Sequence, residues 1–252
     1  MIRPARILAP LGLAAALALA ALPAVAEECR TVAFETVEHL VCSYDLSAFQ
    51  IRLHWKDPKG RPYGSLRSFA RSDIGRAARF AMNAGMYERD STPVGLYVED
   101  GETMRPLSTR DGPGNFHMKP NGIFFLADGR AGVLDTAAFG TADLAPDFAT
   151  QSGPMLVIAG KLHPRFIPGS DSIKIRNGVG VSADGRTVTF AISQARVSFD
   201  AFARLFRDEL GIADALYLDG TISSVYAPEV DRADFFWPVG PIIAAYPRGS
   251  SG

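Results

Sequence analysis

The amino-acid sequence predicts a single α+β domain, built mainly from antiparallel β-hairpins with a few packed helices. Several short apolar or alternating runs meet at Asp-Gly pairs, which favour tight hairpin turns because both residues tolerate positive φ. Only one segment, near residue 200, has a convincing helical periodicity, and no linker or low-complexity tract divides the chain. Hairpins with few helices are typical of a mainly antiparallel α+β domain.

The chain begins with a predicted secretory signal peptide, residues 1–26. Arg3 and Arg6 precede an apolar stretch from Leu11 to Leu22, and Ala24-Val25-Ala26 matches a signal cleavage sequence. The apolar core is shorter than the ~20 residues that a membrane-spanning helix needs, so an uncleaved anchor is the less favoured alternative. We therefore expect residues 27–252 to form the mature domain, periplasmic or secreted, without stable membrane insertion after cleavage.

Charge and cysteine content narrow the possible functions. The formal net charge is −1, which argues against nucleic acid or an anionic membrane as the main partner. Cys29 and Cys42 are the two cysteines, and in an oxidising compartment they are expected to form a disulfide that closes a hairpin. With His39 they do not complete a metal coordination shell. No cofactor and no built-in metal site are expected, although a loosely held divalent cation paired with phosphate stays open.

The expected strands follow from β-branched, aromatic or alternating residues. They span 31–44, 51–55 and 80–82, with a helical segment broken by Gly75 at 66–80. Four hairpin turns are expected at Asp100-Gly101, Asp128-Gly129, Ala159-Gly160 and Asp184-Gly185.

The one convincing helix begins after Ser198, which can cap it, and ends at Gly211. Its apolar face is expected to pack in the core and consists of Phe199, Phe202, Leu205, Phe206 and Leu210. The helix leads to a buried strand at 216–218, and a final strand is expected at 242–246.

The most informative polar group follows this buried strand. Asp219 stands where the strand ends, and Gly220 allows a sharp turn or the close approach of a ligand. Thr221, Ser223 and Ser224 add hydroxyls, which suit sugar or phosphate oxygens because they both donate and accept hydrogen bonds. The alternative is a plain strand-to-loop turn in which Asp219 bonds its own backbone.

Polar residues mark the ends of other strand patterns as well. The segments combine an amide, hydroxyl or charge with Gly or Pro, and they lie at 83–87, 115–122, 151–154, 176–178 and 219–221. Loops at strand ends are where binding and catalytic sites are usually built, so these segments are expected to converge.

The ordered set of motifs resembles the phosphodiester glycosidase family, especially its small bacterial single-domain members. The matching stretches cover most of the mature chain and lie at 80–87, 92–96, 119–122, 150–155, 176–180 and 216–221. Two residues depart from the family pattern, because Thr221 replaces a second Gly and Ala84 stands where Gly is common. The substrate of the best-known member is therefore not carried over to this chain.

A glycosyl phosphodiester requires proton transfer and phosphate binding, and the sequence offers candidates for both. Asp219 is the expected general acid or base, Arg176 is expected to bind phosphate through its planar fork, and Asn83 completes the catalytic set. The predicted substrate-binding residues are Lys119, Asn121, Ser152, Asn177, Gln194, Thr221 and Ser223. Lys174 is expected to be a solvated surface cation. Glu88 and Asp90 are candidates for a second carboxylate, with surface solvation equally expected.

Together these interpretations predict an exported hydrolase that cleaves a glycosyl phosphodiester or a related glycan-phosphate bond of the cell envelope. The first alternative is a non-catalytic glycan-binding module, which would need the amide and hydroxyl contacts but no proton transfer by Asp219. The second is a metal-dependent phosphodiesterase, which a chelator would inactivate.

Overall fold

The computed structural model describes residues 28–219 and 222–249, and within them three antiparallel β-sheets are formed. The large sheet runs in the order β1 (Cys29–Phe34), β2 (Val37–Asp45), β13 (Thr187–Ser193), β12 (Asn177–Val181), β14 (Asp214–Asp219), β10 (Met155–Ile158) and β11 (Lys161–Leu162). The β4 sheet runs in the order β16 (Arg232–Ala233), β15 (Val225–Ala227), β4 (Phe80–Asn83), β17 (Ile242–Pro247) and β3 (Phe49–His54). The β9 sheet runs in the order β6 (Glu102–Arg105), β5 (Tyr97–Glu99), β9 (Phe148–Ser152), β7 (Gly122–Ala127) and β8 (Arg130–Asp135).

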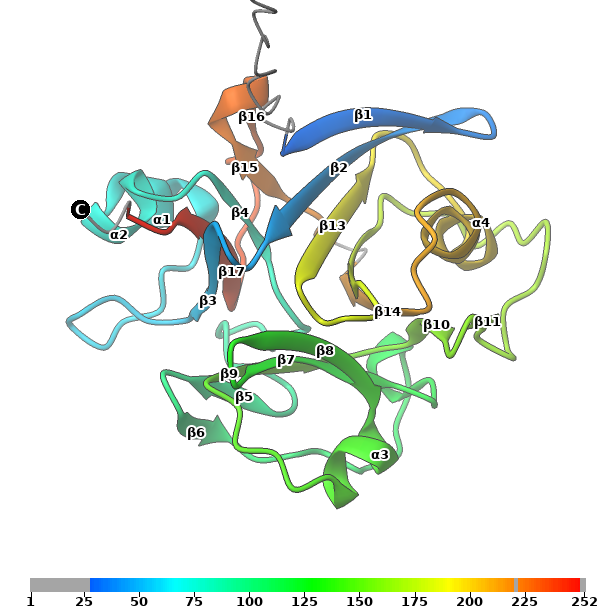
Figure 1. Ribbon diagram of the computed structural model, residues 1–252, viewed down its shortest axis with the longest axis horizontal. Coiled ribbons are helices and arrows are strands. Elements are labelled where there is room, and N and C mark those ends of the chain that lie inside the picture. Colours follow the sequence, from blue (N-terminus) through cyan, green and yellow to red (C-terminus); the bar gives the residue numbers. More distant parts are fainter. Residues whose placement is uncertain (1–27, 220–221, 250–252) are drawn as a thin grey trace, which may run out of the picture.

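The sheets surround a shared core, and short helices cover their outer faces (Figure 1). The helices α1 (Leu66–Arg71) and α2 (Asp73–Arg76) lie on the β4 sheet, and α3 (Thr136–Thr141) lies on the β9 sheet. The helix α4 (Phe199–Arg204) continues as the π-helical turn η2 (Leu205–Glu209) and packs on the large sheet. Two short 3-10 turns complete the described elements, η1 (Asn115–His117) and η3 (Pro228–Val230). This arrangement confirms the predicted α+β fold.

Strand β14 shows why the sequence folds into covered sheets. Successive side chains of a strand point to opposite faces, so Leu216 and Leu218 enter the shared core while Ala215 and Tyr217 face α4. Because both faces are buried, the strand is a continuous apolar run rather than an alternating one. The alternation also places Asp219 on the same face of β14 as Tyr217.

The predicted hairpin turns have the expected backbone at three of the four sites. Both residues have positive φ in Asp100-Gly101, Asp128-Gly129 and Ala159-Gly160. The fourth predicted hairpin also forms, between β12 and β13, but in its 182–186 loop only Gly185 has positive φ, at 71°. A longer loop built around a single left-handed glycine still joins antiparallel strands.

Helical segments are shorter than the sequence indicated. The expected 66–80 segment is divided into α1 and α2, where Ser72 caps the second helix by accepting the Gly75 N–H. A Cβ atom on Gly75 would lie 1.9 Å from the Phe69 carbonyl oxygen, so this close turn requires glycine. The helix after Ser198 has the predicted cap, but it is α-helical only to Arg204 and then widens into η2.

The first hairpin contains the predicted disulfide. Cys29 and Cys42 are directly opposite in β1 and β2 and are bonded to each other, which confirms the pairing. No helix among the described residues is long and apolar enough to cross a membrane. The predicted signal peptide and Thr221 lie outside the described residues.

Candidate active site

Three strand ends from two sheets meet in one buried amide network, formed by Asn83, Asn177 and the backbone of Asp219. Asn177 Nδ2 donates to Oδ1 of Asn83 at 3.0 Å, and Asn177 Oδ1 accepts the Asp219 N–H at 2.8 Å. Asn83 Oδ1 also accepts the N–H of Ser224 at 2.9 Å. Both asparagines are fully buried, so these bonds form in a low-dielectric interior where polar groups must be paired.

Strand pairing brings the network together. Asn177 lies opposite Asp219 in the β12–β14 pair, with a register irregularity between Asn177 and Gly178. A Cβ atom on Gly178 would lie 2.9 Å from the Leu216 carbonyl oxygen, so glycine lets the two strands approach closely at this point. Asn83 ends β4, which lies between β15 and β17 in the β4 sheet.

Two predicted hydroxyls also contact the end of β14. Ser152 Oγ donates to the Leu218 carbonyl at 2.8 Å, and Ser223 Oγ lies 2.9 Å from the carbonyl oxygen of Asp219. The backbone of Asp219 is thus held at its N–H by Asn177 and at its carbonyl by Ser223. Such fixation of the backbone helps to position the Asp219 side chain.

Two tyrosines near Asp219 are site residues that the sequence analysis missed. Burial raises the pKa of Tyr217, and the charge of Asp219 raises it further while Arg176 opposes the shift. Burial likewise raises the pKa of Tyr87, again with a contribution from Asp219, and the Tyr87 hydroxyl donates to the Pro238 carbonyl at 2.9 Å. Both phenols therefore stay protonated at neutral pH. Tyr217 could have been found from its position two residues before Asp219, on the same strand face.

Arg176 lies beside the network but is almost completely buried, with 1% of its surface exposed. Its Nε and one Nη donate to the carbonyls of Val197 and Ser172, both at 2.9 Å, and the guanidinium stacks on Phe199 at 3.5 Å from the ring centroid. Burial lowers the pKa of Arg176, and the neighbouring Tyr217 counteracts this. The second Nη has no hydrogen-bond partner among the described residues. Two nitrogens of the guanidinium are thus already hydrogen-bonded inside the protein. Arg176 therefore does not present a pair of free donors that could bind two phosphate oxygens.

Lys119 and Asn121 lie outside the amide network. Lys119 Nζ contacts the carboxylate of Asp111 at 2.6 Å on the exposed surface. The buried amide of Asn121 donates to the Phe116 carbonyl at 2.8 Å and accepts from Thr136 Oγ1 at 2.9 Å. Both ends of this amide therefore stabilise the loop that precedes β7.

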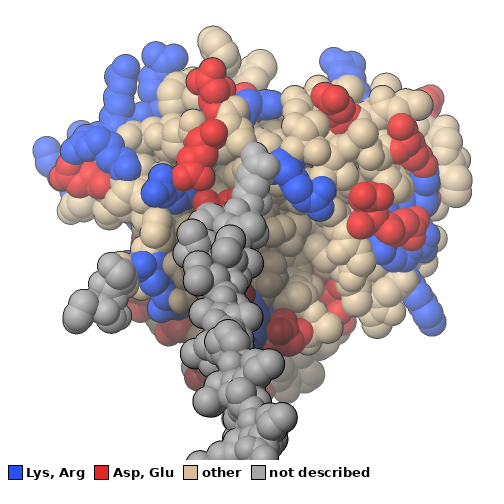
Figure 2. Space-filling view, turned by 45° about the horizontal axis from the view of Figure 1, so that its top comes forward, with Lys and Arg blue, Asp and Glu red and all other residues tan. Residues whose placement is uncertain are grey.

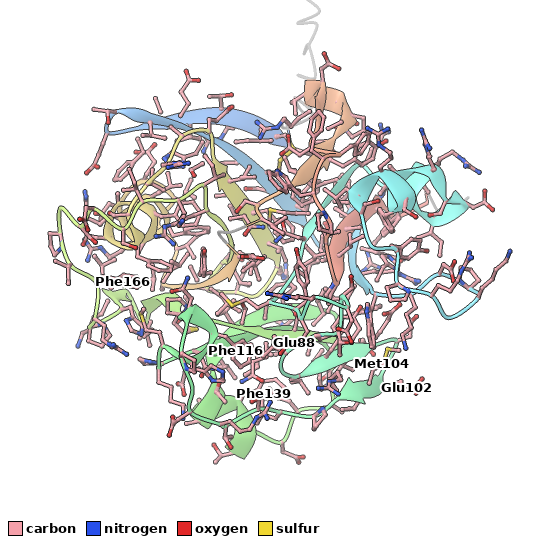
Figure 3. All side chains as sticks on the ribbon, turned by 180° about the vertical axis from the view of Figure 1, so that it is seen from behind. Glu88, Glu102, Met104, Phe116, Phe139 and Phe166 are labelled. Atoms are coloured by element: carbon pink, nitrogen blue, oxygen red, sulfur yellow. A yellow bond between two sulfur atoms is a disulfide. The ribbon has the colours of Figure 1, made fainter. Side chains whose placement is uncertain are left out.

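The remaining candidates lie at the surface. Gln194 is exposed and accepts from Arg232 at 3.2 Å. Asp90 accepts the Thr92 N–H at 3.0 Å, which lowers its pKa and indicates a local turn. Glu88 is exposed, and Figure 3 shows it close to the junction between the β9 sheet and the other two sheets. Across residues 28–219 and 222–249, no three His, Cys, Asp or Glu side chains are grouped as metal ligands.

A family model described as phosphodiester glycosidase matches residues 76–245, a range that includes the amide network, both tyrosines and Arg176. The chain belongs to the phosphodiester glycosidase family. The resemblance of the ordered motifs is thereby confirmed, and the family consists of glycosidase-type hydrolases. Among curated proteins, this chain is 38% identical over 179 residues to the uncharacterized protein YigE of Escherichia coli K12, covering 70% of this chain and 69% of that protein.

Solved structures share the phosphodiester glycosidase fold. One is the zebrafish N-acetylglucosamine-1-phosphodiester alpha-N-acetylglucosaminidase catalytic domain, auto-inhibited by its pro-peptide, with a TM-score of 0.59 and 13% identity over 87% of this chain and 82% of that chain. Another is a hypothetical protein from Synechocystis, with a TM-score of 0.54 and 14% identity over 87% of this chain and 61% of that chain. At such identities the likeness concerns the fold alone.

Proposed function

We propose that this protein is an exported hydrolase that cleaves a glycosyl phosphodiester, or a related glycan-phosphate bond, of the cell envelope. Membership of a family of glycosidase-type hydrolases supports the reaction class. The observation that carries the proposal is the amide network, which holds the backbone of Asp219 where three strand ends meet. A carboxylate whose backbone is held on both sides, at the end of β14, suits proton transfer at a bound substrate.

Asp219 is assigned the proton transfer. When water adds to the sugar and the phosphate ester departs, a base must take a proton from the water, and a positioned carboxylate is a suitable acceptor. Asn177 positions Asp219 rather than binds substrate, because both ends of its amide are hydrogen-bonded within the network. The oxygen of the Asn83 amide is bonded in the same network, whereas its Nδ2 has no partner among the described residues.

The anionic phosphate needs hydrogen-bond donors that stay protonated, and Tyr217 is assigned this role. Burial raises the pKa of Tyr217, so it keeps its hydroxyl proton. The Tyr87 hydroxyl already donates its proton to the Pro238 carbonyl, so Tyr87 is not assigned to the phosphate. Arg176 contributes positive charge from its buried position beside Tyr217, which strengthens that hydroxyl as a donor. Arg176 therefore acts through its positive charge on Tyr217 and does not bind two phosphate oxygens directly.

Export is part of the same proposal. The apolar stretch from Leu11 to Leu22 and the following Ala-x-Ala sequence support it. The Cys29–Cys42 bond supports it as well, because disulfides persist in oxidising compartments such as the periplasm.

The test is a panel of glycosyl phosphodiesters that differ in sugar and aglycone, assayed for free sugar and phosphomonoester. The proposal expects turnover of at least one member by the wild-type protein, and the activity should persist after treatment with EDTA. Activity that disappears with EDTA and returns with a divalent cation would instead indicate a metal-dependent phosphodiesterase. An absence of turnover across the panel, with sugar binding retained in calorimetry, would indicate a glycan-binding module.

A further inference from the structure

A cavity of about 390 Å³ adjoins the amide network. It lies between the end of β13 and the β15–β16 hairpin and is here called the Trp237 cavity. Its wall includes Ile175 and Ser223, and Ser223 Oγ lies 3.2 Å from the Ile175 carbonyl and 2.9 Å from the Asp219 carbonyl. The cavity therefore begins one hydrogen bond away from the backbone of Asp219. Its volume falls within the roughly 300–1,000 Å³ that is usual for small-ligand sites.

The lining of the Trp237 cavity is positively charged. It contains Lys174, Arg196, Arg232 and a single carboxylate, Asp234. Arg232 is neutralised because its Nε and one Nη contact the two oxygens of Asp234 at 2.8 Å and 3.0 Å. Within the described parts of the chain, Lys174 and Arg196 form no ion pair. On the face shown in Figure 2, basic and acidic side chains are interspersed. In the Trp237 cavity, by contrast, two cations lie without an ion pair, which indicates a place for an anionic group.

Two neighbouring aromatic side chains form the rim of the same cavity. Phe236 is 87% exposed and Trp237 is 58% exposed, which is unusual for adjacent large apolar residues. The C–H face of a sugar ring packs well on an aromatic face, whose quadrupole is negative there. The cavity thus combines a surface for a sugar ring with cations for a negative group.

We propose that the Trp237 cavity binds the aglycone of the substrate, as a sugar that bears a second phosphate in addition to the scissile phosphodiester. Such an aglycone occurs in a chain of sugars joined through phosphodiesters. Trp237 stacks on its ring, and Lys174 with Arg196 binds the second phosphate. The inference rests on the proposed function, since it specifies the leaving group of that reaction.

A binding experiment tests the cavity without requiring turnover. Trp55 and Trp237 are the two tryptophans, so the Trp55→Phe protein reports on Trp237 alone when its fluorescence is titrated with glucose 6-phosphate or glucose. Glucose 6-phosphate should change the emission and bind about tenfold or more tightly than glucose. Adding Lys174→Ala and Arg196→Ala should remove this preference, and Lys174→Arg with Arg196→Lys should restore most of it. Equal affinity for the two probes, or a preference that survives the double alanine variant, would overturn the proposal.

The matched control removes the same charge elsewhere. Lys161 and Arg165 are exposed and lie outside the cavity lining, so Lys161→Ala with Arg165→Ala should keep the preference for glucose 6-phosphate. If this control variant loses the preference equally, the effect comes from net charge and the cavity is not the site. Calorimetry with Trp237→Ala and Trp237→Phe tests the stacking, because only the phenylalanine variant keeps an aromatic face.

Kinetics then connect the cavity with the reaction. For two diesters of the same sugar, one with a methyl aglycone and one with a phosphorylated sugar aglycone, Lys174→Ala with Arg196→Ala should raise KM only for the second. If the binding results are as expected but no diester is turned over, the cavity is supported as a binding site for a phosphorylated sugar, and the proposed hydrolase function is contradicted. If both diesters are cleaved and the variant changes KM equally for both, the proposed hydrolase function is supported, and the assignment of the Trp237 cavity to the aglycone is contradicted.

Discussion

The side-chain oxygen of Asn177 accepts the backbone N–H of Asp219 at 2.8 Å, across the β12–β14 pair. The nitrogen of the same amide donates to Asn83 on the neighbouring sheet at 3.0 Å. One side chain thus joins two sheets and holds the residue assigned to proton transfer. Shortening it would leave buried polar groups unpaired on both sides.

Asn177→Ala should therefore reduce both stability and activity. We expect a loss of about 2–4 kcal/mol in the free energy of unfolding, because the Asp219 N–H and the Asn83 amide lose partners. Turnover should fall about 100-fold in the remaining folded protein, since a small displacement of a catalytic group has effects of that size. Urea unfolding and kcat measured on the same preparation check both values.

Asn121→Ala is the matched control for this change. Its buried amide also has both ends bonded, but it stabilises the loop before β7. It should lose similar stability and keep kcat within about threefold of wild type. A fully active Asn177→Ala protein, or an equal kcat loss in both variants, would contradict the role of the network.

Arg176→Lys should destabilise the protein although it conserves the charge. A lysine ammonium cannot reach the carbonyls of Ser172 and Val197 together or stack flat on Phe199, so about 2–3 kcal/mol should be lost in urea unfolding. Arg165→Lys, on the exposed surface, should change stability by less than about 0.5 kcal/mol. An unchanged unfolding midpoint for Arg176→Lys would show that the buried contacts contribute little.

Reduction of the Cys29–Cys42 bond should lower stability by about 3 kcal/mol, the usual size for a short closed loop. Unfolding in urea with and without dithiothreitol measures this difference. The Cys29→Ser/Cys42→Ser variant should match the reduced wild type and should not respond to the reductant. A reductant effect of the same size on that variant would mean that the bond is not its cause.

Stability should fall as the solution is acidified from about pH 6.5 to about pH 4. Burial lowers the pKa of His54 to about 4, so the unfolded chain binds a proton within this window that the folded protein does not. The loss is on the order of 3 kcal/mol for this residue. Nearby Glu99 acts in the opposite direction, because burial raises its pKa and protonation then favours the folded state.

The variant His54→Phe/Tyr246→Phe tests this pH dependence. It removes both partners of the hydrogen bond between the His54 ring and the Tyr246 hydroxyl, so neither is left unpaired. The slope of unfolding free energy against pH should become shallower. The remaining slope includes His39, whose pKa burial lowers to about 4, and His163, whose pKa burial also lowers. An unchanged slope would show that His54 is not the group responsible.

Local turn chemistry made the hairpins predictable. Asp100-Gly101 and Asp128-Gly129 have the positive φ that their sequences favour. The arrangement of three sheets was not predictable, because strands such as β14 are buried on both faces and their apolar runs do not indicate a partner. The pairing of β15 with β4, far apart in the chain, has no local signal either.

The sequence predicted that polar residues at strand ends come together, but it did not predict how they are arranged. Strand-end polar residues such as Asn83 and Asn177 do converge, although they are 94 positions apart in the sequence. The burial of Arg176 was missed because it depends on Phe199, which belongs to a different element and looked like ordinary core packing. Tyr217 was missed because a strand tyrosine has the pattern of a core residue, whereas Tyr87 lies in the loop between β4 and β5.

The most direct test compares the wild type with Asp219→Asn, measuring kcat for a cleaved diester and Kd for the same diester by calorimetry. The account predicts that kcat falls about 1,000-fold or more, as when a positioned acid or base is removed, while Kd changes by less than about threefold. Normal turnover by Asp219→Asn would contradict the assignment of proton transfer to this carboxylate.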